Sequence, residues 1–104
     1  MTIAASPEAG AWGPGYVYAI RAKGTEMVKI GHSHDPLKRM RSLQTGSPVP
    51  LRLLWVKAVA SMVRAEDRLH DHLLDRWSHG EWFRLPDIQA ADLEEILAGY
   101  LPQI

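Results

Sequence analysis

A single carboxylate on an otherwise apolar helix face is the first sign of chemistry in this 104-residue sequence. Residues 61–75 have the periodicity of an amphipathic helix, and both Glu66 and His70 fall inside its apolar arc. A carboxylate among apolar side chains is costly unless it is paired, protonated or bound to a metal ion. Glu66 therefore either pairs with a buried arginine or with His70 one turn on, or lines a cleft as a functional group. His70 alone is typical of a histidine satisfied within a core.

A second candidate region, residues 28–40, combines a strand-like run, a glycine turn and the start of a basic helix. This combination can bind phosphate, because a helix start and basic side chains both attract anions. Asp35 followed by Pro36 is a strong signal for the start of that helix. Three basic residues of the helix lie outside its apolar stripe or at its border and are candidate nucleic-acid contacts: Lys38, Arg39 and Arg41.

The charges are unevenly distributed along the chain, although the formal net charge is zero. Residues 21–57 hold eight basic residues against two acidic ones, whereas residues 58–104 hold four basic residues against nine acidic ones. One half could therefore meet phosphates while the other stays solvated or holds a cation, and two ordinary solvated surfaces would give the same counts. Because the sequence has no cysteine, a metal ion would have to be held by carboxylates, imidazoles or water.

The elements that must position these groups can be read from periodicity and from turn residues. Three runs rich in β-forming residues predict strands: 16–22, 27–33 and 51–59. Three segments with helical periodicity or start signals predict helices: 36–45, 61–75 and 87–99. In addition to the apolar face of the second predicted helix, the following residues are expected in the core: Leu37, Met40, Leu43, Trp82, Phe83, Leu85, Leu93, Ile96 and Leu97.

The first two strands are close enough in sequence to form an antiparallel hairpin. With a two-residue turn, Tyr18 would oppose Lys29, and Tyr16 would oppose Gly31. This register places a phenol beside an ammonium group. Gly31 can also break the alternation of the second strand and turn His32 toward the same cleft.

The order of these pieces resembles the GIY-YIG nuclease superfamily, and more closely its short KIG-type branch of phage-type DNA-binding domains. The resemblance covers about residues 15–85 and rests on Tyr16-Val17-Tyr18, Lys29-Ile30-Gly31, Asp35-Pro36 with Lys38-Arg39, residues 43–48, Glu66 with His70, and Glu81-Trp82-Phe83. It implies an α+β domain with a three-stranded antiparallel β-sheet flanked by helices. That domain would occupy residues 15–104, after a flexible N-terminal arm at residues 1–14.

The resemblance further implies a DNA endonuclease or nickase that hydrolyses phosphodiester bonds with Mg²⁺ or Mn²⁺. By position, Tyr18 matches the tyrosine of the first motif, Arg39 the phosphate-binding arginine and Glu66 the metal-binding glutamate. Tyr18, or a neighbour acting through it, would take a proton from the attacking water. The partner would be the phosphate backbone of DNA. The remaining candidate catalytic residues and their supports are Tyr16, Lys29, His32, Gly31 and His70.

Two departures from the nuclease pattern keep other functions open. Lys29 occupies the position of the second tyrosine, and no residue matches the late asparagine of several active members. The alternative is a non-catalytic DNA-binding module on the same fold, and a protein-interaction domain is a third hypothesis. A zinc site made of Glu66, His70 and His32 is also conceivable, although no catalytic-zinc signature accompanies it.

The sequence also bears on the location of the protein in the cell and on its partners. The N-terminal residues lack the basic start and apolar run of a signal peptide, and no segment is long enough to span a membrane. We therefore expect a cytoplasmic protein. A chain of this length has little room for an added recognition module, so a partner protein or an oligomer could supply specificity.

Overall fold

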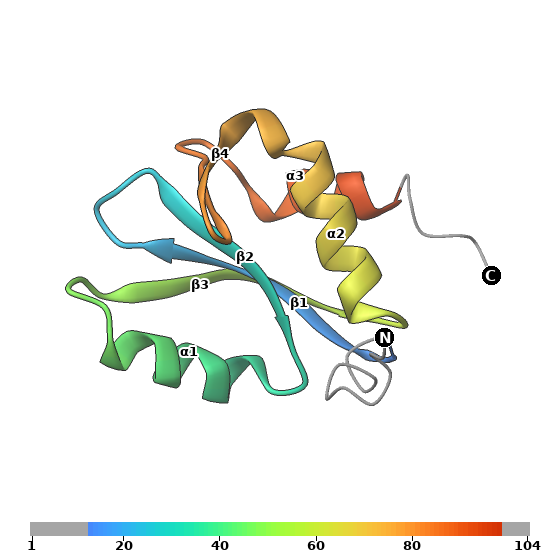
Figure 1. Ribbon diagram of the computed structural model, residues 1–104, viewed down its shortest axis with the longest axis horizontal. Helices are drawn as coiled ribbons and strands as arrows, with labels where there is room; N and C mark the ends of the chain where they lie inside the picture. The colour runs from blue at the N-terminus through green and yellow to red at the C-terminus, as the bar shows by residue number, and fades with distance from the viewer. Residues whose placement is uncertain (1–12, 99–104) are drawn as a thin grey trace, which may run out of the picture.

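A five-stranded antiparallel sheet forms the centre of the computed structural model, which describes residues 13–98 (Figure 1). The strands lie in the order β3-β1-β2-β5-β4. Their bounds are β1 Gly15–Ala22, β2 Met27–Ser33, β3 Leu51–Val59, β4 Trp77–His79 and β5 Trp82–Arg84. The α+β class therefore agrees with the prediction, but the predicted three-stranded sheet is wrong.

Two short strands account for this difference. β5 pairs with β2 through Met27 and Arg84, Val28 and Phe83, and Lys29 and Trp82, and β4 then pairs with β5. An edge strand presents unpaired backbone N–H and C=O groups, and the aromatic run at residues 82–84 satisfies part of that edge. Residues 76–86, predicted only to cap the core, therefore also extend the sheet.

The hairpin of β1 and β2 has a different register from the predicted one. Tyr18 lies opposite Gly31 rather than opposite Lys29, and the whole predicted register is wrong by two residues. The connection contains four residues (23–26) instead of two, and Gly24 within it has a φ of +82°, which favours glycine. Because side chains alternate with a period of two, this error leaves every side chain on its expected face.

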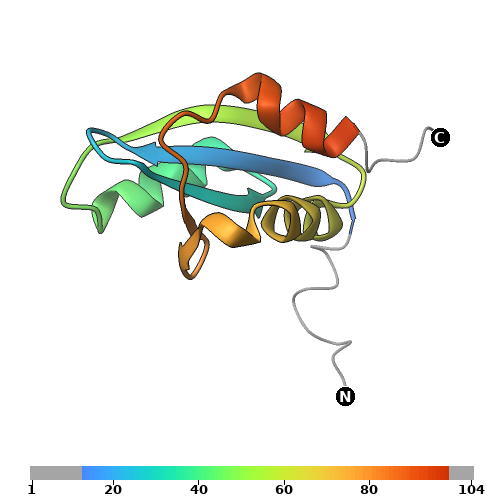
Figure 2. The same cartoon turned by 90° about the horizontal axis from the view of Figure 1, so that it is seen from above.

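The helices cover the two faces of the sheet unequally. α1 (Pro36–Thr45) lies on one face, and α2 (Met62–His72) and α3 (Ala90–Ala98) lie on the other (Figure 1). Seen from above, α2 runs alongside β2 and α3 runs alongside β3 (Figure 2). A 3₁₀ turn, η3 (Leu74–Arg76), follows α2. The first two helices begin within a residue of their predicted starts, whereas α3 begins three residues later than expected.

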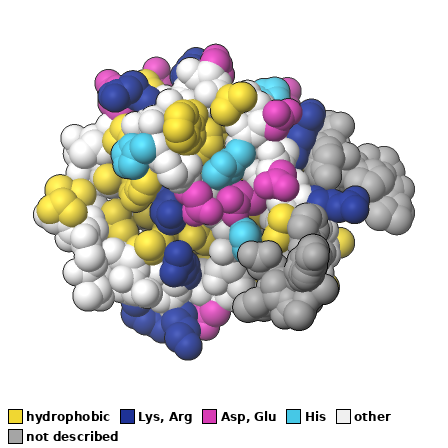
Figure 3. Space-filling model, viewed as in Figure 1, with side chains coloured by type: hydrophobic (Ala, Val, Ile, Leu, Met, Phe, Trp, Pro, Cys, Tyr) yellow, Lys and Arg dark blue, Asp and Glu magenta, His cyan; other side chains and the backbone are white. Residues whose placement is uncertain are grey.

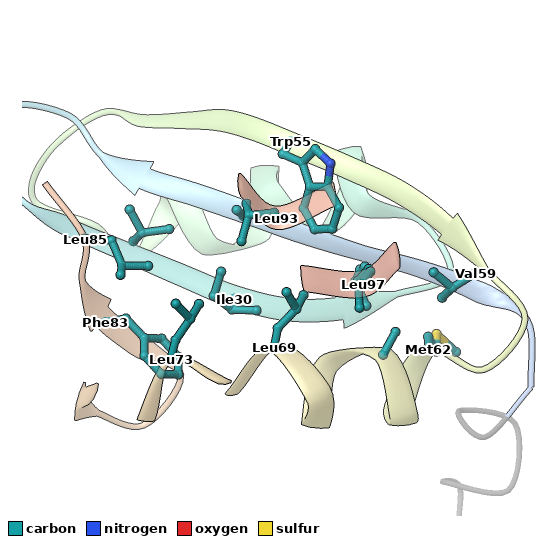
Figure 4. Close-up of a cluster of buried hydrophobic side chains, with 14 residues drawn as sticks. Ile30, Trp55, Val59, Met62, Leu69, Leu73, Phe83, Leu85, Leu93 and Leu97 are labelled. Carbon is teal, nitrogen blue, oxygen red and sulfur yellow. The ribbon is translucent and has the colours of Figure 1, made fainter. Parts of the chain in front are cut away.

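The hydrophobic core lies between the sheet and the pair α2 and α3 (Figure 4). Phe83 and Leu85 are buried there as predicted, and so are Leu93 and Leu97 of α3, while Ile96 packs against the edge of the core. The fully buried side chains that the sheet and α2 contribute include Val17, Val28, Ile30, Met62 and Leu69. This core holds α2, and with it Glu66, firmly against β2.

The opposite face, under α1, is less completely covered. None of the residues of α1 is buried, and the side chain of Leu37 is 56% exposed. The predicted buried stripe is therefore wrong for Leu37, and Met40 and Leu43 are only half-buried. One ten-residue helix lies on this face, whereas two helices share the other. Apolar surface consequently stays accessible beside α1.

The predicted N-terminal arm, residues 1–14, lies outside the described residues except for residues 13 and 14. The end of the predicted last helix, residue 99, lies outside them as well. Within residues 13–98, no helix has the length and apolar character needed to cross a membrane.

Candidate functional site

The candidate site forms where β5 stops pairing with β2. The last paired residues are Lys29 and Trp82, and the backbone N–H of Ile30 donates to the carbonyl of Glu81 at 3.0 Å. Among the described strands, none pairs with β2 beyond this point on that side. Side chains from both faces of the sheet can therefore meet around its edge. Figure 3 shows carboxylates, imidazoles and basic side chains gathered between β2 and α2.

Gly31 allows this meeting because it has no side chain. A Cβ atom at Gly31 would lie 2.5 Å from the phenolic oxygen of Tyr18 and 3.1 Å from Oε1 of Glu81. The first distance is much shorter than van der Waals contact, so only glycine leaves room for both groups. The phenol of Tyr18 and the carboxylate of Glu81 therefore lie over the backbone of β2 at Gly31.

An ion pair fixes the charge of Glu81. Nζ of Lys29 lies 2.9 Å from Oε1 of Glu81, and it also lies 5.8 Å from the centre of the Trp82 ring. Burial would raise the pKa of Glu81, but hydrogen bonds with Lys29 and Glu66 outweigh burial and lower it. Glu81 is therefore ionised at neutral pH. Lys29 is buried against this carboxylate and does not lie opposite the phenol of Tyr18, contrary to the predicted register.

Glu66 is a buried carboxyl group that interacts with His32, His70 and Glu81. Its Oε1 contacts Nδ1 of His32, and its Oε2 lies 3.3 Å from Nε2 of His70. Nε2 of His70 also lies 2.8 Å from the carbonyl oxygen of Ile30, which fixes the ring against β2. Burial, followed by repulsion from Glu81, raises the pKa of Glu66 to about 9. At neutral pH the two neighbouring carboxyl groups thus hold one proton between them.

One interpretation of Glu66 from the sequence, the pairing with His70, describes part of its surroundings. The pairing with His70 one turn on is present, and His32 reaches the same carboxyl group. His32 does so from the same side of β2 as Ile30, so no break in the alternation of the strand is needed. The pairing with Glu81, from a segment fifteen positions later, was not predicted.

Tyr18 and Arg39 reach the site from the face covered by α1. Tyr18 is almost completely buried on β1, and burial raises the pKa of its phenol above the ordinary value. The nearby guanidinium of Arg39 lowers this pKa, but it does not outweigh burial. The phenol is therefore neutral at physiological pH. Arg39 is exposed on α1, where it can contact both the phenol and a ligand in solvent.

The remaining predicted site residues lie at different distances from this cluster. Lys38 and Arg41 are also exposed on α1, and Arg41 lies about 160° around the helix axis from Arg39. Tyr16 lies two residues before Tyr18 on β1, is 39% exposed, and lines a separate hollow beside α1. The structure thus brings together the cluster around Gly31 and leaves Tyr16 next to it. The cluster consists of Tyr18, Lys29, His32, Arg39, Glu66, His70 and Glu81.

The donor set of the cluster can be compared with the requirements of metal ions. Glu66 and Glu81 offer carboxylate oxygens from two different elements, and Mg²⁺ needs only one or two such ligands when water supplies the rest. A zinc site made of Glu66, His32 and His70 would need three groups arranged around one point. Within residues 13–98, no three or more His, Cys, Asp or Glu side chains have the arrangement of a metal site. The carboxylate pair therefore fits a hydrated hard cation better than zinc.

Glu81 is the site residue that sequence reasoning missed. It follows Gly80, whose φ of +54° forms the turn between β4 and β5. The only signal in the sequence was an acidic residue between this glycine and an aromatic strand, within the Glu81-Trp82-Phe83 piece of the family resemblance. Its position became evident only through the pairing of β5 with β2.

Comparison with known families corrects the resemblance drawn from the sequence. The family model of the T5orf172 domain matches residues 15–100, and it is this family, not the GIY-YIG family, that the chain matches. The match extends over the whole described fold, whereas the resemblance depended on several short pieces. No curated protein and no solved structure matches the chain.

Proposed function

The chain belongs to the T5orf172 domain family, and we propose that it is a metal-dependent DNA endonuclease or nickase that hydrolyses phosphodiester bonds. T5orf172 is a phage-associated domain often linked to endonuclease or DNA-binding function, which gives this chain a nuclease or DNA-binding role with DNA as its partner. The observation that carries the finer proposal is the carboxylate pair of buried Glu66 and half-buried Glu81 next to Tyr18 and Lys29.

The carboxylate pair is the proposed holder of the divalent cation. Mg²⁺ or Mn²⁺ bound by Glu66 and Glu81 would supply positive charge to a phosphate oxygen. In the protein alone, Glu66 keeps its proton because it is buried beside the charge of Glu81. A compensating positive charge would favour the loss of that proton, so the pair is suited to exchange a proton for a cation.

The other residues of the cluster have roles that follow from their charge and position. Arg39, exposed on α1 above Tyr18, would donate hydrogen bonds to the nonbridging oxygens of the phosphate. Lys29 holds Glu81 in its ionised form. Tyr18 retains its proton in this environment and would orient the attacking water through its hydroxyl group instead of taking a proton from it.

The test of this proposal is a cleavage assay with a matched pair of variants. Purified protein is incubated with supercoiled and branched DNA in the presence of Mg²⁺ or Mn²⁺. Glu66→Gln keeps the size and the uncharged state of the protonated side chain, so the fold is expected to persist, while cleavage should fall by at least about a hundredfold. Glu95→Gln removes an exposed carboxylate of α3 and should leave cleavage unchanged. Absence of metal-dependent cutting, or cutting that survives Glu66→Gln, would contradict the proposal.

One observation favours a second candidate, a DNA-binding module without turnover. Both carboxyl oxygens of Glu66 already contact histidines, which can satisfy this group without a cation. Such a module would bind DNA in a salt-sensitive manner, because Lys38 and Arg39 would neutralise phosphates. Binding would weaken in Arg39→Ala, and the DNA would stay intact with either metal ion. The cleavage assay above therefore separates the two candidates.

A further inference from the structure

Beside α1, the sheet carries an open apolar hollow with a volume of about 470 Å³, which is within the range of small-ligand sites. Three apolar side chains that line it are unusually exposed: Tyr16 is 39% exposed, Leu37 is 56% exposed and Val56 is 42% exposed. Leu53 also lines it, opposite Ile20 in the sheet, and His34 and Asp35, which follow β2, lie at the other end near Tyr16. Exposed apolar groups gathered in one hollow often mark a binding site.

We propose that this hollow accepts an unpaired nucleobase of a DNA strand whose phosphates lie along α1. The inference rests on the proposed function, which supplies DNA as the partner, and it adds a substrate class: DNA with an unpaired base close to the phosphate held by Arg39. Bulges, flaps and single-stranded junctions belong to this class, whereas a perfect duplex does not.

The chemistry of the hollow matches that of a nucleobase. A base has two apolar faces and one polar edge, and proteins hold unpaired bases by stacking on aromatic rings and by hydrogen bonds to the edge. Tyr16 offers an exposed ring, and Leu37 and Val56 offer apolar contact. His34 and Asp35 provide a donor or acceptor at one end only.

The hollow also lies close to the candidate site. Tyr16 and Tyr18 lie on the same face of β1, and Val56 lies opposite Tyr18 in the register of β1 and β3. Two residues along a strand span about 7 Å. This length is close to the axial rise of about two nucleotides in one DNA strand. A base in the hollow would therefore belong to a nucleotide one or two steps from the phosphate at Tyr18 and Arg39.

The charges around the hollow support a nucleic acid as its occupant. Leu37, which lines the hollow, is followed on α1 by three exposed basic residues: Lys38, Arg39 and Arg41. Apolar side chains next to exposed basic residues are suited to a ligand with stacking faces and a phosphate backbone. A second copy of this chain would bring the same positive helix to the interface, and the repulsion between the two helices would oppose its docking there.

The test compares the binding of two DNAs without divalent metal, so that cleavage plays no part. One is a short perfect duplex, and the other is the same duplex with one unpaired 2-aminopurine, whose fluorescence falls when it stacks. The wild type should prefer the second DNA by about tenfold, as expected for one base stacked on an aromatic ring, and should quench its fluorescence. Tyr16→Ala should lose both effects, and Tyr16→Phe should keep them because the ring remains. Leu74→Ala removes an apolar side chain of η3 that is 62% exposed and serves as the control.

The outcomes distinguish this inference from the proposed function. Equal binding of both DNAs by the wild type, or a loss of affinity in Tyr16→Ala that is the same for both, would overturn the inference and leave the nuclease proposal standing. A dimer of the protein that dissociates in Leu37→Ser would show that a second copy covers the hollow and would also overturn it. Failure to bind either DNA at low salt would remove the proposed function together with the inference.

Discussion

Adding one methyl group at Gly31 should disrupt the candidate site and destabilise the fold. In Gly31→Ala the new Cβ would lie 2.5 Å from the phenolic oxygen of Tyr18 and 2.7 Å from the ring carbon that carries it. Tyr18 cannot easily yield, because its ring is rigid and almost completely buried on β1. Either the phenol or the backbone of β2 must move, and Glu81, only 3.1 Å from the new atom, must move with it.

The free-energy cost of this clash can be isolated by comparison with a second glycine. Overpacking of this kind costs about 1–3 kcal/mol. A change from glycine to alanine also stabilises a protein by about 0.4–1 kcal/mol, because it reduces the freedom of the unfolded chain. Gly46, at the end of α1, has a φ of −98° and no atom within 4 Å of an added Cβ. Gly46→Ala should therefore be as stable as the wild type or slightly more stable, and the difference between the two variants measures the clash.

Urea denaturation followed by circular dichroism gives the free energy of unfolding of each variant. We expect Gly31→Ala to be less stable than Gly46→Ala by about 1–3 kcal/mol. We also expect it to lose the function of the site, measured as DNA cleavage, while Gly46→Ala retains it. Equal stabilities of the two variants would refute the close approach of Tyr18 to the backbone at Gly31.

Three further predictions test other parts of the structure. The pKa of Glu66 is raised from its ordinary value of 4.5 to about 9, so folding binds a proton between these values and the stability of the wild type should fall as pH rises. In urea titrations from pH 5 to pH 8, the wild type should lose up to about 1.4 kcal/mol per pH unit relative to Glu66→Gln, and parallel profiles would contradict the raised pKa. Arg39→Gln should lower the salt dependence of DNA binding by about one phosphate contact, measured as the slope of log K against log salt concentration, and an unchanged slope would argue against contact with DNA. Leu93→Ala, in the core between α3 and the sheet, should reduce the free energy of unfolding by about 2–5 kcal/mol, and a change below 1 kcal/mol would indicate that α3 packs differently.

The face on which each strand residue lies could be predicted from the sequence, but its neighbours could not. Alternation alone places Tyr18 and Lys29 on one face, and a register error of two residues leaves this assignment intact. The neighbours depend on the turn. Oγ1 of Thr25 donates to the carbonyl of Ala22 at 2.7 Å and accepts from the N–H of Met27 at 3.0 Å. These two hydrogen bonds close a four-residue connection. Lys23-Gly24 in the sequence favours a two-residue turn and does not indicate these hydrogen bonds of Thr25.

Helix boundaries were predictable because their determinants are local, whereas burial was not. Oδ1 of Asp35 accepts a hydrogen bond from the N–H of Lys38 at 3.1 Å, as expected from an N-cap residue followed by proline. Amphipathicity identifies the side of a helix that faces the sheet, but not how closely the two pack. Leu37 is on the correct side of α1 and is nevertheless 56% exposed. The hollow beside it could therefore not have been found from periodicity.

The sequence interpretation omitted Glu81 from the site and predicted only three strands, and these two errors have one cause. Glu66 could be recognised because it breaks the apolar pattern of a helix, but Glu81 follows a turn and breaks no pattern. Glu81 reaches the site only because β5 pairs with β2, and β5 is one of the two strands that a three-stranded sheet omits. The same strand also gives Lys29 its partner, because Nζ of Lys29 lies 2.9 Å from Glu81 and keeps that carboxylate ionised. Burial and the ionised Glu81 together keep Glu66 protonated, so the pairing of this three-residue strand contributes to the charge of the carboxylate pair.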